Sequence, residues 1–100
     1  MASNLEKAEL GRALLVNADL TDANLERAYL ARADLRNARL TGANLRGAEF
    51  YLADLRGADI AGAQNLTQEQ LEDSCGDDTT SLPPGLAAPP TWPCASQEGD

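Results

Sequence analysis

An apolar residue recurs at every fifth position over the first sixty residues of the chain. These positions hold Leu5, Leu10, Leu15, Leu20, Leu25, Leu30, Leu35, Leu40, Leu45, Phe50, Leu55 and Ile60. The residue two places earlier is alanine at every unit from Ala8 to Ala58, and Ser3 is the one exception. The residue between them is polar in most units, which makes the unit Ala-(Asp/Asn)-Leu-x-x. A short tandem unit of this kind indicates a solenoid, in which each repeat packs on its neighbours.

Neither a regular helix nor a straight strand can bury these positions. On an α-helix five residues advance by about 500°, so the leucines would be spread around the whole circumference. On a straight strand, residues five apart point to opposite faces because the side-chain period is two. A chain that bends once per repeat can instead point the alanine and the leucine inward each time. The spacing therefore predicts a coil around an Ala/Leu core.

The tandem Ala-Asp-Leu-x-x units resemble the pentapeptide-repeat family, and the resemblance covers residues 3 to about 62. It implies an all-β fold, a right-handed quadrilateral β-helix in which four repeats make one coil, so the repeats would form about three coils. Residues twenty apart would then stack in columns. Two such columns are Asn4, Asn24, Asn44 and Asp19, Arg39, Asp59. Local duplication with drift would give the same columns.

The repeat ends after Ile60, because two residues separate Ala63 from Leu66. Thr67 and Gln70 then form the sequence pattern of a capping box, which predicts a short helix from Thr67 to about Cys75. We expect this helix to cover the open end of the coil. The sequence therefore divides into a β-helix over 1–66, a capping helix over 67–76 and a tail over 77–100. Similar C-terminal segments occur in bacterial pentapeptide-repeat proteins, and this resemblance also favours a cap.

Charge and proline content distinguish the tail from the coil. The formal net charge is −8, but residues 1–66 hold nine acids and eight bases and are nearly neutral. Residues 67–100 hold seven acids, no base and all five prolines. This composition predicts an extended or disordered tail. Leu82, Leu86 and Trp92 also allow the tail to fold back on the coil.

The composition argues against several function classes. The chain has no histidine and two cysteines, so a histidine-based active site is excluded and a zinc site would lack ligands. The carboxylates follow the repeat on a solvated wall, where nothing desolvates them. We therefore expect no enzyme activity, no metal and no cofactor. Its start does not resemble a signal peptide, and no apolar run approaches the length of about 18 residues that spans a membrane, which favours a cytoplasmic protein.

Cys75 and Cys94 are the two cysteines of the chain. A disulfide between them would tie the tail to the helix and contribute ~3 kcal/mol in the loop-entropy model. Two free thiols are the alternative in a reducing cytoplasm.

One wall of the predicted coil carries the side chains that binding surfaces favour. The repeats centred on Leu10, Leu30 and Phe50 place tyrosine, arginine and leucine outward together. The candidate partner-binding residues are Arg12, Tyr29, Arg32, Tyr51 and Leu52. Tyr and Arg are enriched in protein interfaces, although surface aromatics can also be scattered without function.

The first coil predicts self-association. It would present unpaired backbone edges and an open core layer, and open edges of this kind pair unless something blocks them. The residues concerned are Leu5, Leu10, Leu14, Leu15, Val16 and Leu20. We expect a homodimer through this end. The alternative is that the chain is a piece of a longer protein whose preceding segment covers the end.

These observations favour a non-enzymatic module that binds an unidentified protein partner. They favour neither nucleic acid nor a membrane as a partner. The alternative function comes from the resemblance, since pentapeptide proteins that confer quinolone resistance mimic duplex DNA and bind the topoisomerase gyrase. A DNA mimic requires an anionic coil, whereas this coil is nearly neutral.

Overall fold

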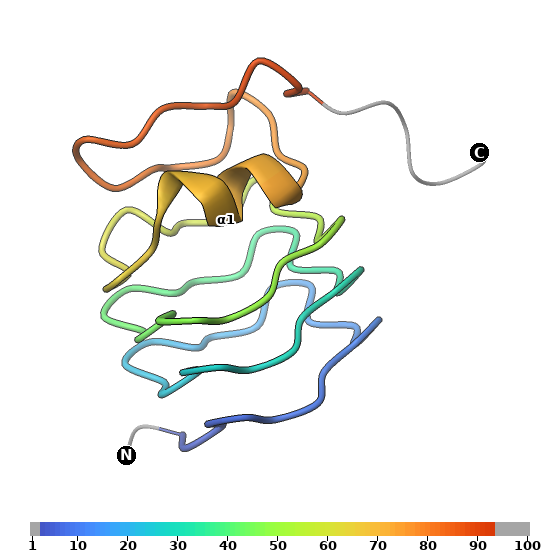
Figure 1. Ribbon diagram of the computed structural model, residues 1–100, viewed down its shortest axis with the longest axis vertical. Coiled ribbons are helices and arrows are strands. Elements are labelled where there is room, and N and C mark those ends of the chain that lie inside the picture. Colours follow the sequence, from blue (N-terminus) through green and yellow to red (C-terminus); the bar gives the residue numbers. More distant parts are fainter. Residues whose placement is uncertain (1–2, 94–100) are drawn as a thin grey trace.

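A computed structural model describes residues 3–93, which rise as stacked coils from the N-terminus to the C-terminus (Figure 1). Parallel bridges join residues twenty apart on four faces of the coil. In chain order the faces carry the columns Asn4/Asn24/Asn44/Gln64, Glu9/Tyr29/Glu49, Leu14/Asp34/Asp54 and Asp19/Arg39/Asp59. Within residues 3–93 these are isolated bridges, and no longer strand forms. The predicted stacking of residues twenty apart is therefore confirmed.

The chain turns a corner after each repeat centre. The amide of the following alanine donates to the carbonyl of the centre, as Ala13 does to Leu10 at 3.0 Å. The third residue of each turn from Lys7 to Gly57 has a positive φ, for example 61° at Arg12, and Gly62 in the next turn does not. This is the conformation of a type II turn, which favours glycine or asparagine. Glycine fills the position at Gly42, Gly47 and Gly57.

Leucine and alanine both point inward, as the period of five predicts. Leu25, Leu30, Leu35, Leu40 and Leu45 are 0 % exposed. The alanines two places before them pack in the same cluster. In the first coil Leu5, Leu10 and Leu15 are only partly buried, because a neighbouring coil covers them on one side alone.

The helix α1 spans Gln68–Asp73, shorter than the predicted Thr67–Cys75, because Ser74 leaves the helical conformation as the C-cap. The predicted capping box is present: the Gln70 amide donates to the Thr67 hydroxyl, and the Thr67 amide donates to Gln70 Oε1. The Gln70 Nε2 also donates to the carbonyls of Leu45 and Ala48, at 2.8 Å each. The Gln70 side chain thus caps α1 and also donates hydrogen bonds to two backbone carbonyls of the third coil below it.

The coil continues beyond the end of the repeat as an irregular fourth layer. Gln64 pairs with Asn44, α1 lies above the second face, Cys75 pairs with Asp54, and Ser81 pairs with Asp59. The spacing along the chain therefore grows from twenty residues to 21 and then 22. The sequence pattern predicts about three coils and does not show this layer.

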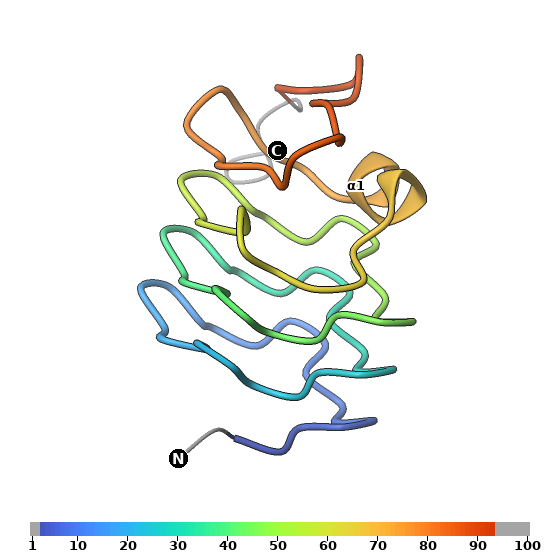
Figure 2. The same cartoon turned by 90° about the vertical axis from the view of Figure 1, so that its left-hand side faces the viewer.

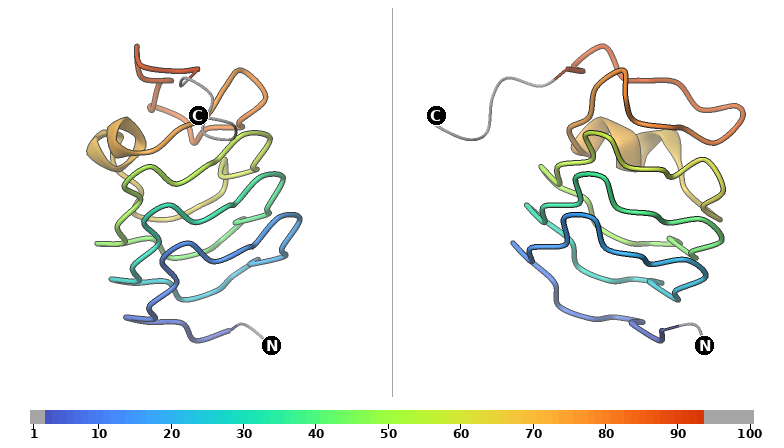
Figure 3. Two further views of the ribbon diagram at one scale, coloured as in Figure 1. Left: turned by 90° about the vertical axis from the view of Figure 1, so that its right-hand side faces the viewer. Right: turned by 180° about the vertical axis from the view of Figure 1, so that it is seen from behind.

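Residues 77–93 pack on the C-terminal end of the coil (Figures 2 and 3). The Thr80 hydroxyl donates to the Leu55 carbonyl at 2.8 Å, and Trp92 Nε1 donates to the Ser74 carbonyl at 2.9 Å. Leu82 and Leu86 pack against the core cluster, and Trp92 is 9 % exposed. The end is therefore covered by α1 and this segment together, rather than by the helix alone.

Cys75 is buried and disulfide-bonded. Cys94 lies outside the described residues, as does the rest of 94–100, so the Cys75–Cys94 pairing stays a prediction. The described part of the chain has no helix that could cross a bilayer.

Candidate functional site

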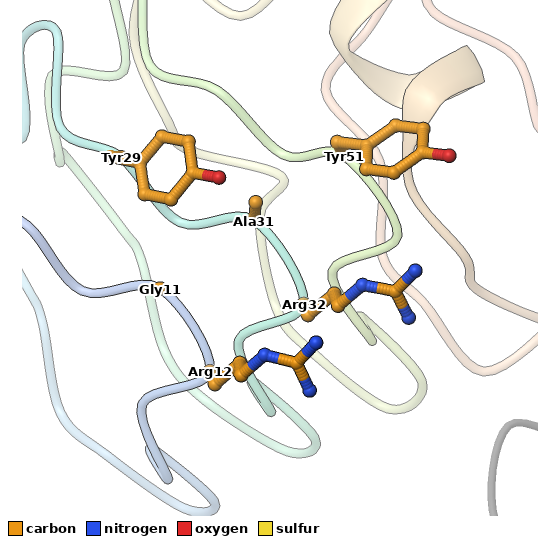
Figure 4. A pocket seen from close by; sticks show the side chains of 6 residues that line it. All are labelled: Gly11, Arg12, Tyr29, Ala31, Arg32 and Tyr51. Carbon is orange, nitrogen blue, oxygen red and sulfur yellow. The ribbon is translucent and has the colours of Figure 1, made fainter.

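A cavity of about 280 Å³ opens on the second face and its following corner. Its lining, which we call the Tyr–Arg face, consists of Gly11, Arg12, Tyr29, Ala31, Arg32 and Tyr51 (Figure 4). These residues come from all three regular coils. The register of twenty residues aligns five of them in a column of Gly11, Ala31 and Tyr51 and a column of Arg12 and Arg32, while Tyr29 stacks between Glu9 and Glu49.

Small residues form the floor of the cavity and let a tyrosine ring lie across it. A Cβ on Gly11 would be 2.9 Å from Tyr29 Cε2 and 3.2 Å from its Cδ2. Ala31, one layer above Gly11, is 6 % exposed. The absence of a side chain at Gly11 therefore sets the position of Tyr29, which is 47 % exposed.

The two arginines extend side by side from successive coils toward the same side (Figure 4). Arg12 donates its backbone amide to the Ala31 carbonyl, and Arg32 donates its amide to the Tyr51 carbonyl, at 2.9 and 2.7 Å. The Arg32 guanidinium lies 6.0 Å from the centre of the Tyr51 ring, the outer range of a cation–π contact. Tyr51 itself is 57 % exposed.

The charge environment of this face differs from that of the neighbouring corner. There, Arg36 and Arg56 bind Asp34 and Asp54 at 2.8 and 2.6 Å. The Arg36 hydrogen bonds hold the pKa of Asp34 below its ordinary value. Within residues 3–93 neither Arg12 nor Arg32 forms an ion pair. The Tyr–Arg face thus carries two arginines without ion pairs next to exposed aromatic rings, and Glu9 and Glu49 flank Tyr29 in the neighbouring column.

Of the five predicted partner-binding residues, Arg12, Tyr29, Arg32 and Tyr51 meet in one cavity. Leu52 differs from the expectation of an exposed leucine. It is half-buried, does not line the cavity, and donates its amide to the carbonyl of Asp73 at the end of α1 at 2.7 Å. The fourth layer, which the repeat does not predict, covers it. Among the described residues no group of three metal-binding side chains is placed to hold an ion.

The repeated coil identifies the family. The family model described as pentapeptide repeats matches eight copies, over residues 2–37 and 33–64. The chain belongs to the pentapeptide-repeat family. Membership implies that the four-faced coil is a right-handed quadrilateral β-helix.

Two solved pentapeptide-repeat proteins are similar to this chain. One is Rfr23 from the cyanobacterium Cyanothece 51142, with 35% identity over 79% of this chain and 56% of that chain, and a TM-score of 0.41. The other is HetL, involved in heterocyst differentiation regulation in the cyanobacterium Nostoc sp. strain PCC 7120, with 34% identity over 79% of this chain and 40% of that chain, and a TM-score of 0.33. The chain therefore spans about half the length of these relatives. A search of curated protein sequences found no match.

Proposed function

We propose that this pentapeptide-repeat chain is a non-enzymatic module that binds an acidic segment of a protein partner through the Tyr–Arg face. The observation that carries the proposal is the cavity in which Arg12 and Arg32, without ion pairs in residues 3–93, adjoin Tyr29 and Tyr51. HetL, a similar protein, is described as involved in regulation, which agrees with a binding role.

The chemistry of the four side chains favours a carboxylate-bearing partner. A guanidinium binds a carboxylate through two parallel hydrogen bonds. Arg12 and Arg32 lie one layer apart, a separation of about 4.8 Å between stacked backbones, so they suit two acidic groups on one extended segment. The tyrosine rings supply apolar contact area, and their hydroxyl groups can donate or accept.

Three carboxyl groups of the chain are unsuited to general-acid catalysis. A hydrogen bond from Arg36 lowers the pKa of Asp34. Hydrogen bonds from Thr21 and Thr79 lower the pKa values of Asp19 and Asp77 in the same way. A lowered pKa keeps each group ionised at neutral pH and unsuited to donate a proton as a general acid. The chain also has no histidine.

The test is affinity capture from an extract of the source cells, followed by titration of the purified captured protein against the wild type and three double variants. We expect Arg12→Ala/Arg32→Ala to weaken binding by at least about tenfold, since each charged hydrogen bond contributes about 1.5–3 kcal/mol. Tyr29→Ala/Tyr51→Ala should weaken it by a similar factor, because it removes the aromatic contact area buried on binding. Binding should also weaken as salt concentration rises. The control Arg39→Ala/Arg46→Ala removes two exposed arginines elsewhere on the coil and should bind normally. Equal binding by all variants would contradict the proposal.

The surface does not favour the gyrase-binding alternative. The side chains that line its cavity are basic or uncharged, whereas a DNA mimic presents negative charge. We expect the chain to leave DNA supercoiling by gyrase unchanged in a direct assay.

A further inference from the structure

The N-terminal edge of the coil carries one unpaired backbone unit on each face. In the second coil Asn24 donates its amide to the Ser3 carbonyl, and its carbonyl accepts from Leu5, at 2.8 and 2.7 Å. The residue at the equivalent position on each face of the first coil directs its amide and its carbonyl in the same direction, away from the second coil. Within residues 3–93 these amides and carbonyls form no hydrogen bond. These residues are Asn4, Glu9, Leu14 and Asp19.

Apolar side chains surround this edge. Leu14 is 84 % exposed and Val16 is 41 % exposed. Leu5, Leu10 and Leu15 are partly buried, whereas their counterparts one coil higher are 0 % exposed. Unpaired backbone and uncovered core therefore occur together at the N-terminal edge of residues 3–93, a combination that favours edge pairing.

We propose that two copies of this chain pair end to end through the backbone edges of their first coils, which run antiparallel. The two copies are related by a two-fold axis perpendicular to the direction in which the coils stack. In an antiparallel pair, two facing residues exchange both of their backbone hydrogen bonds. That requires residues whose amide and carbonyl point to the same side, which is the arrangement at this edge. A two-fold axis brings identical ends together with the chains running in opposite directions.

One register pairs every unpaired backbone unit. It places Asn4 opposite Asp19 of the second copy, and Glu9 opposite Leu14 of the second copy. A shift of one repeat in either direction leaves one unit unpaired. It also places Glu9 opposite either Glu9 or Asp19 of the second copy, and facing like charges destabilise a pair. Backbone pairing and charge therefore select the same register.

The same register matches the inward side chains in size. Leu5, Leu10 and Leu15 lie opposite Ala18, Ala13 and Ala8 of the second copy, so each large residue meets a small one. Lys7 lies opposite Val16 of the second copy, where its alkyl stem can cover the exposed valine. The contact would close both open core layers.

The size of the end limits the strength of the pairing. The molecule measures 29 × 21 Å across its two shorter axes, so the contact buries on the order of 1,000 Å² in total, the lower limit of a specific interface. The C-terminal end is covered by α1 and residues 77–93, so association stops at a dimer rather than continuing as a fibre.

Sedimentation equilibrium of the 100-residue chain tests the proposal. We expect a concentration-dependent dimer in the micromolar range and a monomer for Leu14→Glu/Val16→Lys. Both side chains are exposed, so the fold should be kept, and Trp92 fluorescence verifies this. The control is Tyr51→Glu, which introduces a charge at an exposed side chain of the third coil. This variant should still dimerise. A wild type that stays monomeric at several hundred micromolar, or a dimer that the edge variant leaves intact, overturns the proposal.

An isosteric exchange tests the register. Asn4→Asp places two acids opposite each other at two symmetric positions and should weaken the dimer several-fold. The double variant Asn4→Asp/Asp19→Asn restores the original pairing with the partners exchanged and should regain wild-type affinity. Loss of affinity in the single variant without recovery in the double variant overturns the register. The Tyr29→Ala/Tyr51→Ala variant separates this proposal from partner binding, because it should still dimerise.

Discussion

The ring of Tyr29 lies where a side chain on Gly11 would begin, since a Cβ there would be 2.9 Å from Tyr29 Cε2. The two residues belong to successive coils, and the register of twenty residues places Gly11 below Ala31, beside the tyrosine. A larger residue at Gly11 would displace the ring and fill the cavity. The shape of the Tyr–Arg face therefore depends on a residue that contributes no side chain.

We predict that Gly11→Val abolishes partner binding while changing the melting temperature little, because the displaced atoms are the end of a flexible, exposed side chain. Calorimetric titration with the captured partner and thermal unfolding measure the two effects. Gly62→Val is the control. Gly62 lies in the turn of another corner, also without a positive φ, and faces Thr41 rather than a cavity residue, so its variant should bind normally. Equal affinities of Gly11→Val and the wild type would contradict the role of this floor.

Leu35→Lys should unfold the coil. Leu35 is 0 % exposed in the core cluster, and an unpaired ammonium there costs several kcal/mol, comparable with the whole stability of a small domain. The melting temperature should fall by more than about 15 °C, since about 1 kcal/mol shifts a domain of this size by about 4–8 °C. Leu14→Lys makes the same change at an 84 % exposed leucine. Measured at concentrations where the chain is monomeric, it should unfold near the wild-type temperature, and equal losses would refute the inward assignment.

Gly76→Ala should loosen the C-terminal segment. A Cβ on Gly76 would be 2.7 Å from two ring atoms of Trp92 and 2.9 Å from the Thr80 hydroxyl oxygen, so the ring must move. We expect its fluorescence to shift to longer wavelength and to become more accessible to acrylamide. Gly62→Ala, where the nearest neighbour is a methyl group of Thr41, should leave the emission unchanged. Unchanged emission in Gly76→Ala would show that Trp92 does not pack there.

Acid should weaken the Asp34–Arg36 pair. The hydrogen bonds from Arg36 lower the pKa of Asp34 from its ordinary value of 3.8. A lowered folded-state pKa stabilises the protein above the unfolded pKa, and this contribution is lost as pH falls through the folded pKa. The wild type should therefore exceed Asp34→Asn in free energy of unfolding at pH 7, and the difference should shrink below pH ~4. Urea unfolding at several pH values measures it, with Asp78→Asn, at an exposed position, as the control. A difference that is constant with pH would contradict the assignment.

The predicted Cys75–Cys94 disulfide should contribute to stability. Cys75 is buried beside Leu55, whose amide donates to the Cys75 carbonyl at 2.6 Å. We expect peptide mapping to recover the two cysteines in one linked fragment. Reduction should destabilise the wild type by up to ~3 kcal/mol, whereas the stability of Cys94→Ser should not respond to reductant. Two free thiols in the protein purified under non-reducing conditions would contradict the prediction.

The sequence by itself determined the regular coil. Each repeat contacts the repeat four units later at a constant spacing, so the columns that join Asn4 to Asn24 and Asp19 to Arg39 can be predicted by counting residues. The capping box of Thr67 and Gln70 can also be predicted, because its partners lie three residues apart. Four of the five predicted binding residues share one cavity for the same reason.

Only the tertiary structure decided the features that depend on contacts between residues at irregular sequence separations. After Ile60 the spacing between paired residues changes, so nothing in the repeat predicts that Cys75 stacks on Asp54 or that Gln70 binds the Leu45 carbonyl. The position of Trp92 likewise depends on a hydrogen bond to Ser74 and on the space above Gly76. Contacts can be predicted by counting residues where the coil geometry repeats every twenty residues. Where it does not, the packing of individual side chains sets the path of the chain.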